Sequence, residues 1–220
     1  MVGGSGIRTE TLASVSGAAP AIADGVLTDR HFVLQRERPS GLAEVELLEM
    51  EPLLRGLLFT DGTVVRTLEA ATLTRVSVNV IEQTRTRLAG PAAAHLQAEE
   101  GAGAVRRRVA IGSTALPRPL IWAESHIVPG RLPDDFLDVL EGSPEGIGES
   151  LQQVKLESWR DLLWFGLERP PRWSEAAPDP SHQVITRRYR VITGKRPVLL
   201  IVESFAVERN EGEYRLGWLA

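Results

Sequence analysis

A carboxylate in the middle of an apolar strand is the first feature of this sequence that points to chemistry. Residues 186–207, TRRYRVITGKRPVLLIVESFAV, are typical of two β-strands joined by a turn around Gly194. Alternation along the second strand places Glu203 on one face with Leu199, Ile201, Phe205 and Val207. An ionised carboxylate loses its hydration on such a face and needs a partner. Glu203 is therefore a candidate for acid–base chemistry or for a structural ion pair.

Arg187, Arg188 and Arg190 on the neighbouring strand are possible partners for Glu203. Arg106, Arg107 and Arg108 form a second basic cluster on an earlier strand. In the earlier cluster, alternation places Arg106 and Arg108 on one face and Arg107 on the other. The residues alone leave two interpretations open, a solvated strand face or an inward guanidinium that binds a carboxylate.

Other motifs are less specific. Gly146, Ile147 and Gly148 fit either a plain turn or a backbone cradle for an anion at the start of a helix. The chain has no cysteine, which excludes disulfides and thiolate metal sites, and its four histidines lack HxxxH or HExxH spacing. We therefore expect no metal site.

Composition narrows the possible functions. The chain has 220 residues, of which 43% are hydrophobic and 25% charged, with a formal net charge of -4. We expect a flexible N-terminal arm over residues 1–25 and a single domain over residues 26–220. The acidic balance argues against binding to nucleic acid. No segment reads as a signal peptide or a membrane span, so we expect a cytoplasmic protein that is a monomer or a small homo-oligomer.

Periodicity predicts the elements that must position Glu203. Strands are predicted at residues 74–86, 105–111, 119–128, from 154 onward, and as the hairpin at 186–207. Helices are predicted at residues 43–59 with a restart at Pro52, after Thr63, and at 134–142, while residues 88–103 form a connector. About six strands with hairpin connections indicate an α+β fold, an antiparallel sheet with flanking helices.

Five motifs taken in order resemble the chorismate pyruvate-lyase family, and its actinobacterial branch in particular. They are GTVVR (62–66), RRRVAI (106–111), AESHIVPGRLP (123–133), GIGESL (146–151) and RRYRVITGKRPVLLIVESF (187–205). The resemblance implies conversion of chorismate to 4-hydroxybenzoate and pyruvate without metal or organic cofactor. It also implies an antiparallel sheet with an enclosed ligand cavity.

The resemblance also implies roles for particular residues. The family's essential arginine falls on Arg108 and its essential glutamate on Glu203, and its ligand-lining backbone falls near Thr63 and near Ile147, just before Gly148. Some members carry a further arginine where this chain has Ser125. The partner of the second, enolpyruvyl carboxylate is therefore open, with Arg188 or Arg190 as candidates.

Two other functions compete with this one. Effector-binding domains of some bacterial transcription regulators resemble the same fold, so a domain that senses a small molecule is one alternative. A lyase acting on a related chorismate-derived substrate is another.

Overall fold

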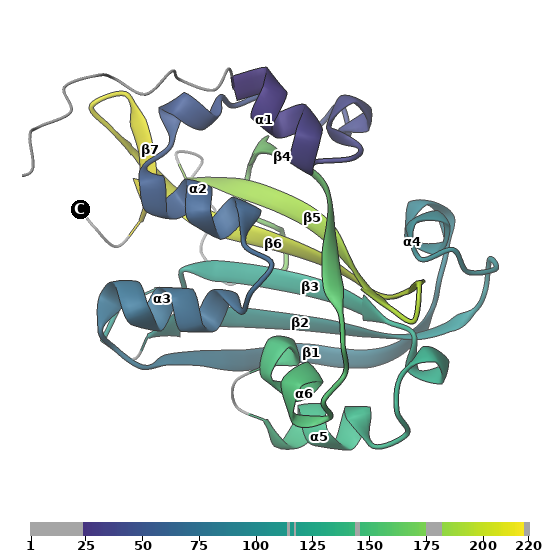
Figure 1. Ribbon diagram of the computed structural model, residues 1–220. Coiled ribbons are helices and arrows are strands. Elements are labelled where there is room, and N and C mark those ends of the chain that lie inside the picture. The colour runs from purple at the N-terminus through teal and green to yellow at the C-terminus, as the bar shows by residue number, and fades with distance from the viewer. Residues whose placement is uncertain (1–23, 114, 117, 144–145, 175–181, 218–220) are drawn as a thin grey trace, which may run out of the picture.

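The computed structural model describes residues 24–113, 115–116, 118–143, 146–174 and 182–217 (Figure 1). The expected arm at residues 1–25 lies almost wholly outside these ranges. The strands are β1 (Val76–Arg87), β2 (Gly103–Ser113), β3 (Ile121–Ile127), β4 (Trp159–Glu168), β5 (Gln183–Thr193), β6 (Arg196–Asn210) and β7 (Glu213–Leu216). The α-helices are α1 (Asp24–His31), α2 (Pro52–Phe59), α3 (Val64–Thr72), α4 (Gly90–His95), α5 (Phe136–Gly142) and α6 (Ile147–Gln153). Short 3-10 turns lie at Gln35–Glu37, Leu47–Glu49 and Pro129–Arg131.

The strands form one antiparallel sheet in the order β1-β2-β3-β6-β5-β4, with β7 paired to β6. This arrangement confirms the predicted α+β fold. The central contact joins β3 to β6, two strands far apart in the chain, with Ala123 opposite Glu203. Two antiparallel meanders, β1-β2-β3 and β4-β5-β6-β7, thus join through the β3–β6 contact, and Glu203 lies near the middle of the sheet.

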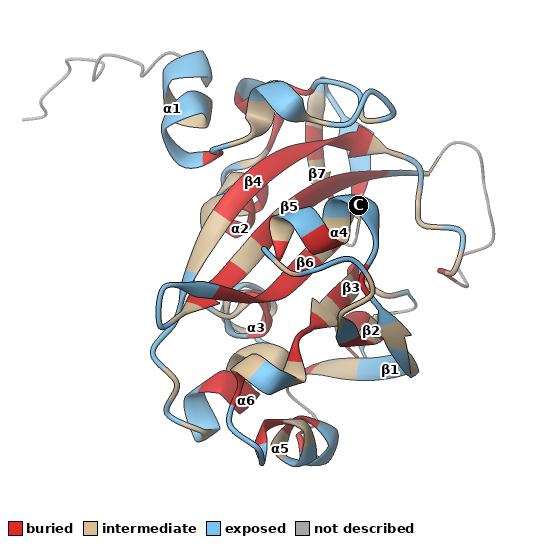
Figure 2. Cartoon of the chain, turned by 90° about the vertical axis from the view of Figure 1, so that its right-hand side faces the viewer, coloured by how far each residue is buried: buried red, intermediate tan, exposed pale blue. Residues whose placement is uncertain are grey.

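Helices cover the two faces of the sheet unequally. Helices α2 and α3 lie over one face, and α4 lies over the other (Figures 1 and 2). The main core forms on the α2 and α3 side, where Leu54, Leu57, Leu58 and Leu68 are fully buried. Helices α5 and α6 pack against each other near the β1 edge. Among the described residues, no helix has the length and apolarity needed to cross a membrane.

Most predicted elements are present with shifted ends. Helix α3 begins after Thr63 as predicted, and the apolar stretch at 43–59 divides into a 3-10 turn at Leu47–Glu49 and a helix that begins at Pro52. Proline is well suited to this first helical position because its missing N–H has no partner there in any helix. The predicted connector at 88–103 contains α4, and β4 begins at Trp159 rather than at residue 154.

Candidate active site

Two rows of side chains cross the α3 side of the sheet, and their order follows from strand register. One row runs through Arg107, Ser125, Ile201 and Tyr189 on β2, β3, β6 and β5. The next row runs through Val109, Ala123, Glu203 and Arg187 on the same strands. Polar groups in an otherwise apolar surface therefore come from strands on both sides of the β3–β6 contact.

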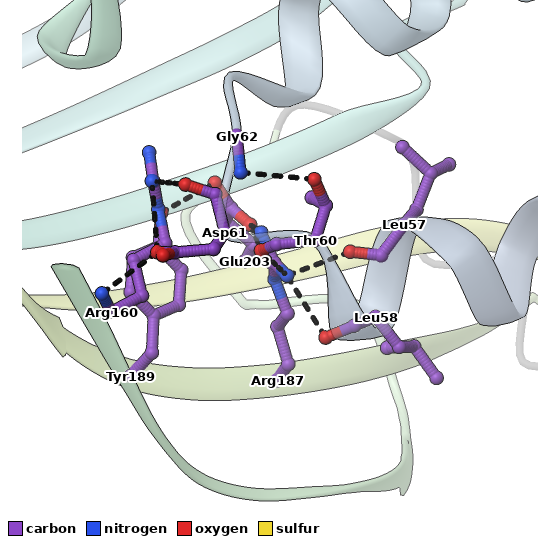
Figure 3. A network of polar contacts seen from close by, with 9 residues as sticks. All are labelled: Leu57, Leu58, Thr60, Asp61, Gly62, Arg160, Arg187, Tyr189 and Glu203. Atoms are coloured by element: carbon purple, nitrogen blue, oxygen red, sulfur yellow. Dashed lines mark hydrogen bonds and ion pairs between the residues drawn. The ribbon is translucent and has the colours of Figure 1, made fainter. Parts of the chain in front are cut away.

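Glu203 is buried and both of its oxygens are bound by β5 (Figure 3). Arg187 Nε donates to Oε2 over 2.8 Å, and Arg187 Nη2 lies 2.7 Å from the same oxygen. The Tyr189 hydroxyl donates to Oε1 over 2.9 Å. Burial and the charge of Glu203 raise the pKa of Tyr189, so its phenol stays protonated and remains a donor. The carboxylate is thus held in a fixed orientation.

Arg187 also connects Glu203 to the end of helix α2 (Figure 3). Its Nη1 donates to the main-chain oxygens of Leu57, Leu58 and Thr60 over 2.7, 2.9 and 3.2 Å. The last carbonyls of a helix lack intrahelical donors and carry partial negative charge, so a guanidinium suits them. The fully buried Arg187 side chain is therefore held on both sides, by the ion pair with Glu203 and by the helix carbonyls.

A cavity lies between this part of the sheet and the starts of α3 and α6. It has about 620 Å³ of space free of atoms, part of it open to solvent. Its apolar walls include Val64, Val65, Val78, Val109 and Ile201. Its polar lining consists of Thr63, Arg107, Ser125, Arg160, Tyr189 and Glu203. A mostly apolar cavity with a few converging polar groups is the usual form of a small-molecule site.

Arg107 is a buried cation at one end of this cavity, with only 4% of its surface exposed. Its Nη1 donates to Gln83 Oε1 over 2.5 Å, and Gln83 in turn donates to Glu141 over 2.7 Å. In the described part of the chain, no carboxylate forms a direct ion pair with Arg107. Burial lowers its pKa, because desolvation disfavours the charged form, although Glu141 acts in the opposite direction. An anionic ligand in the cavity would supply the missing partner.

Arg160 enters the cavity from β4 (Figure 3). Its guanidinium carbon lies 5.6 Å from the centre of the Tyr189 ring, and its Nη1 donates to the main-chain oxygen of Asp61. Among the described residues, its buried Nε has no hydrogen-bond partner. Desolvation lowers the pKa of Arg160, but Tyr189, Glu203 and Asp61 together more than offset that effect and raise it. Arg160 therefore remains a cation beside Tyr189.

Helices α3 and α6 meet at the cavity through Thr63 and Gly148. A Cβ atom placed on Gly148 would lie 2.1 Å from Thr63 Cγ2, so only glycine allows this approach. Gly146, which precedes α6, has a φ of 85° and lies against Val78. The predicted GIG motif thus positions Thr63 and Ile147 in the cavity wall.

A family model described as Rv2949c-like chorismate pyruvate-lyase matches residues 58–211. The match covers both rows of side chains and every residue that lines the cavity. The chain belongs to this family.

Curated relatives agree with the assignment. A chorismate pyruvate-lyase of Mycobacterium tuberculosis is 26% identical over 171 residues, which is 74% of this chain and 84% of the relative. A chorismate pyruvate-lyase of Mycobacterium leprae is 26% identical over 168 residues, with 74% and 79% covered.

Solved structures with the same fold include effector domains of regulators. The effector domain of PhnF from Mycobacterium smegmatis has a TM-score of 0.53 and 8% identity, with 67% of this chain and 90% of that chain covered. A putative GntR-family transcriptional regulator has a TM-score of 0.52 and 13% identity, with 71% and 63% covered. At such low identity the likeness concerns the fold alone.

Among the residues that the family resemblance singles out, Glu203, Thr63, Ile147 and Gly148 line the cavity and Arg108 does not. The Arg108 side chain points to the opposite face, where it pairs with Glu124 over 2.6 Å and with Glu82 over 2.9 Å. Side chains alternate along β2, so its neighbour Arg107 faces the cavity. The expected pairing of Arg108 with Glu203 is therefore corrected, and Arg187 is the partner of Glu203.

Arg188 and Arg190 are also outside the cavity. Arg188 lies over the Trp164 ring at 4.8 Å, and Arg190 pairs with Asp161 on the outer face. Neither can hold a second carboxylate in the cavity from these positions. The sequence prediction did not select Arg107, Arg187 or Tyr189 as site residues. Alternation could have indicated all three, because each shares a strand face with apolar residues.

Proposed function

We propose that this member of the family eliminates pyruvate from chorismate and releases 4-hydroxybenzoate. The observation that carries the proposal is the placement of Arg107 in the same cavity as Glu203, as a buried cation with no direct carboxylate partner among the residues that the structure describes. The ring carboxylate of chorismate supplies the anion that Arg107 lacks, and the planar guanidinium suits a carboxylate.

The spacing of Arg107 and Glu203 supports this substrate. Two strand spacings and two residues along the strand separate their Cα atoms, which corresponds to about 12 Å. Both side chains extend into the intervening space. A six-membered ring with its carboxylate and its hydroxyl on opposite carbons can therefore contact Arg107 at one end and Glu203 at the other.

The reaction requires mainly that the substrate is correctly oriented and that one proton is transferred. The C4–H bond and the C3–O bond break, and the ring becomes aromatic while enolpyruvate leaves. The proton lost from C4 is balanced by the proton that the enolpyruvate methylene gains as it becomes pyruvate. Glu203, held by Arg187 and Tyr189, accepts a hydrogen bond from the C4 hydroxyl and fixes the ring for elimination.

The direct test is to incubate the purified protein with chorismate and to measure pyruvate together with 4-hydroxybenzoate. Equal amounts of both products, formed faster than in the protein-free control and lost in Glu203→Gln, support the proposal. Tight binding of 4-hydroxybenzoate without turnover favours a sensing domain, which the fold also serves in the regulators above. Pyruvate with a different aromatic product favours a related chorismate-derived substrate.

A further inference from the structure

The proposed substrate carries two carboxylates, and Arg107 accounts for only one of them. The second belongs to the enolpyruvyl group and leaves with pyruvate. Arg188 and Arg190 face away from the cavity, and Ser125, which follows Arg107 in its row, is uncharged. The inference below rests on the proposed function, because it concerns how the same cavity recognises that second anion.

Arg160 has the properties that a second anion requires. It lines the cavity, and its Nε is buried with no hydrogen-bond partner among the described residues. Asp61, its carboxylate neighbour, has 62% of its side chain exposed, and the closest approach of that carboxylate to Nη1 is 3.5 Å. The direct ion pair with Asp61 is therefore long, and Nε is left to bind a ligand in the cavity.

The position of Arg160 also matches the shape of the substrate. In chorismate, the ether-bearing C3 adjoins the hydroxyl-bearing C4, so the enolpyruvyl carboxylate must lie beside the hydroxyl end of the ring. Glu203 marks that end, and Tyr189 joins it to Arg160, because its hydroxyl binds Glu203 while its ring lies under the Arg160 guanidinium. Arg107 holds the far end of the ring.

We propose that Arg160 binds the enolpyruvyl carboxylate and that it makes the cavity selective for dianionic over monoanionic ring acids. The hydrogen bonds from its main-chain N–H and Nη1 to Asp61 fix the guanidinium at the cavity wall. The product 4-hydroxybenzoate lacks this second anion, so its binding does not depend on Arg160.

Two stable aromatic probes test the assignment by calorimetry without any turnover. 3-(Carboxymethoxy)-4-hydroxybenzoate carries the second carboxylate, and 4-hydroxy-3-methoxybenzoate is its monoanionic counterpart. We expect Arg160→Met to weaken binding of the dianion by roughly 10- to 100-fold, the loss of a charge-assisted hydrogen bond, and to leave the monoanion unchanged. Arg160→Lys should retain part of the preference, because it keeps a charge without the planar fork.

Arg190→Met is the matched control, because the Arg190 side chain is about as buried as that of Arg160 and also pairs with an aspartate, Asp161, but on the outer face. Neither affinity should change in this variant. The assignment would be overturned if the two Arg160 variants lost affinity equally for both probes or lost affinity for neither. It would also be overturned if the wild-type protein did not prefer the dianion. A wild-type protein that prefers the dianion through Arg160 and yet forms no 4-hydroxybenzoate from chorismate overturns the lyase proposal alone.

Discussion

Arg187 and Glu203 face each other across β5 and β6, and their ion pair is buried at the centre of the sheet. The pair serves both the packing of α2 on the sheet and the orientation of a carboxylate in the cavity. Arg187 satisfies the carbonyls at the end of α2, and the same guanidinium orients the carboxylate that faces the cavity. A change in this pair therefore alters both the stability of the fold and the position of Glu203.

Removing one member of the pair should cost more than removing both. In Arg187→Met, Glu203 stays buried without its cation, and we expect the free energy of unfolding to fall by about 3–5 kcal/mol. In the double variant Arg187→Met with Glu203→Met, no uncompensated charge remains, so the loss should be smaller. Urea unfolding of the single and double variants measures both values. Additive losses would contradict the coupling.

Glu203→Gln should reduce catalysis in a chain that still folds. The amide keeps the size of the side chain and an oxygen that accepts from Arg187, but it lacks the charge that the reaction uses. We expect turnover of chorismate to fall by roughly 10²- to 10⁴-fold, with cooperative unfolding retained. Glu124→Gln is the control, because Glu124 pairs with Arg108 on the other face. Turnover at the wild-type rate would remove Glu203 from the mechanism.

The sequence was sufficient to predict the antiparallel sheet and the position of Glu203 on an apolar strand face, because both depend on local alternation. A strand pattern shows which residues share a face, and a charge on an apolar face is visible without a structure. The same reasoning separates Arg107 from Arg108, since Val105, Val109 and Ile111 share the face of Arg107. Motif matching selected Arg108, whose side chain lies on the other face, because a shift of one residue in a strand reverses the face.

Arg160 had no comparable pattern in the sequence. Its segment, WRDLLWFG, fits a helix or a strand, and its position in the cavity depends on the pairing of β4 with β5 at the far edge of the sheet. The bulge between Leu162 and Trp164 shifts that register further. The position of Arg160 in the cavity is therefore set by strand pairing rather than by a pattern within its own segment.

A substitution at Arg107 should weaken product binding, whereas one at Arg108 should not affect it. Arg107→Met removes the buried cation of the cavity, and we expect affinity for 4-hydroxybenzoate to fall by roughly 10- to 100-fold. Arg108→Met removes ion pairs on the other face and should leave that affinity unchanged. Calorimetric titration of the two variants with 4-hydroxybenzoate distinguishes them. Loss of binding in Arg108→Met alone would restore the motif-based assignment.

Two histidines should make the fold less stable in mild acid. Burial lowers the pKa of His126 and of His95, and nearby arginines act in the same direction, although Glu124 and Glu37 partly oppose the shift. As the pH falls below 6.5, the ordinary pKa of histidine, the unfolded chain binds more protons than the folded chain. The contribution of the two histidines to the free energy of unfolding is therefore fully present above pH 6.5 and is lost as the pH falls below it. Urea unfolding at pH 7.5 and 5.5 measures the decline. It should shrink in a His95→Gln, His126→Gln double variant but not in a variant of the exposed His31.

The contact between Gly148 and Thr63 predicts a specific rescue. In Gly148→Ala, the added methyl meets Thr63 Cγ2, so either α3 or α6 must move, at a cost of about 1–3 kcal/mol in the free energy of unfolding. Thr63→Ser removes that methyl and should recover most of the loss. Gly142→Ala, at the end of α5 with no atom near its new Cβ, is the matched control and should leave stability unchanged. Because Thr63 and Gly148 both line the cavity, affinity for 4-hydroxybenzoate should fall in Gly148→Ala and return in the double variant. A loss of stability that Thr63→Ser does not relieve would place the strain elsewhere.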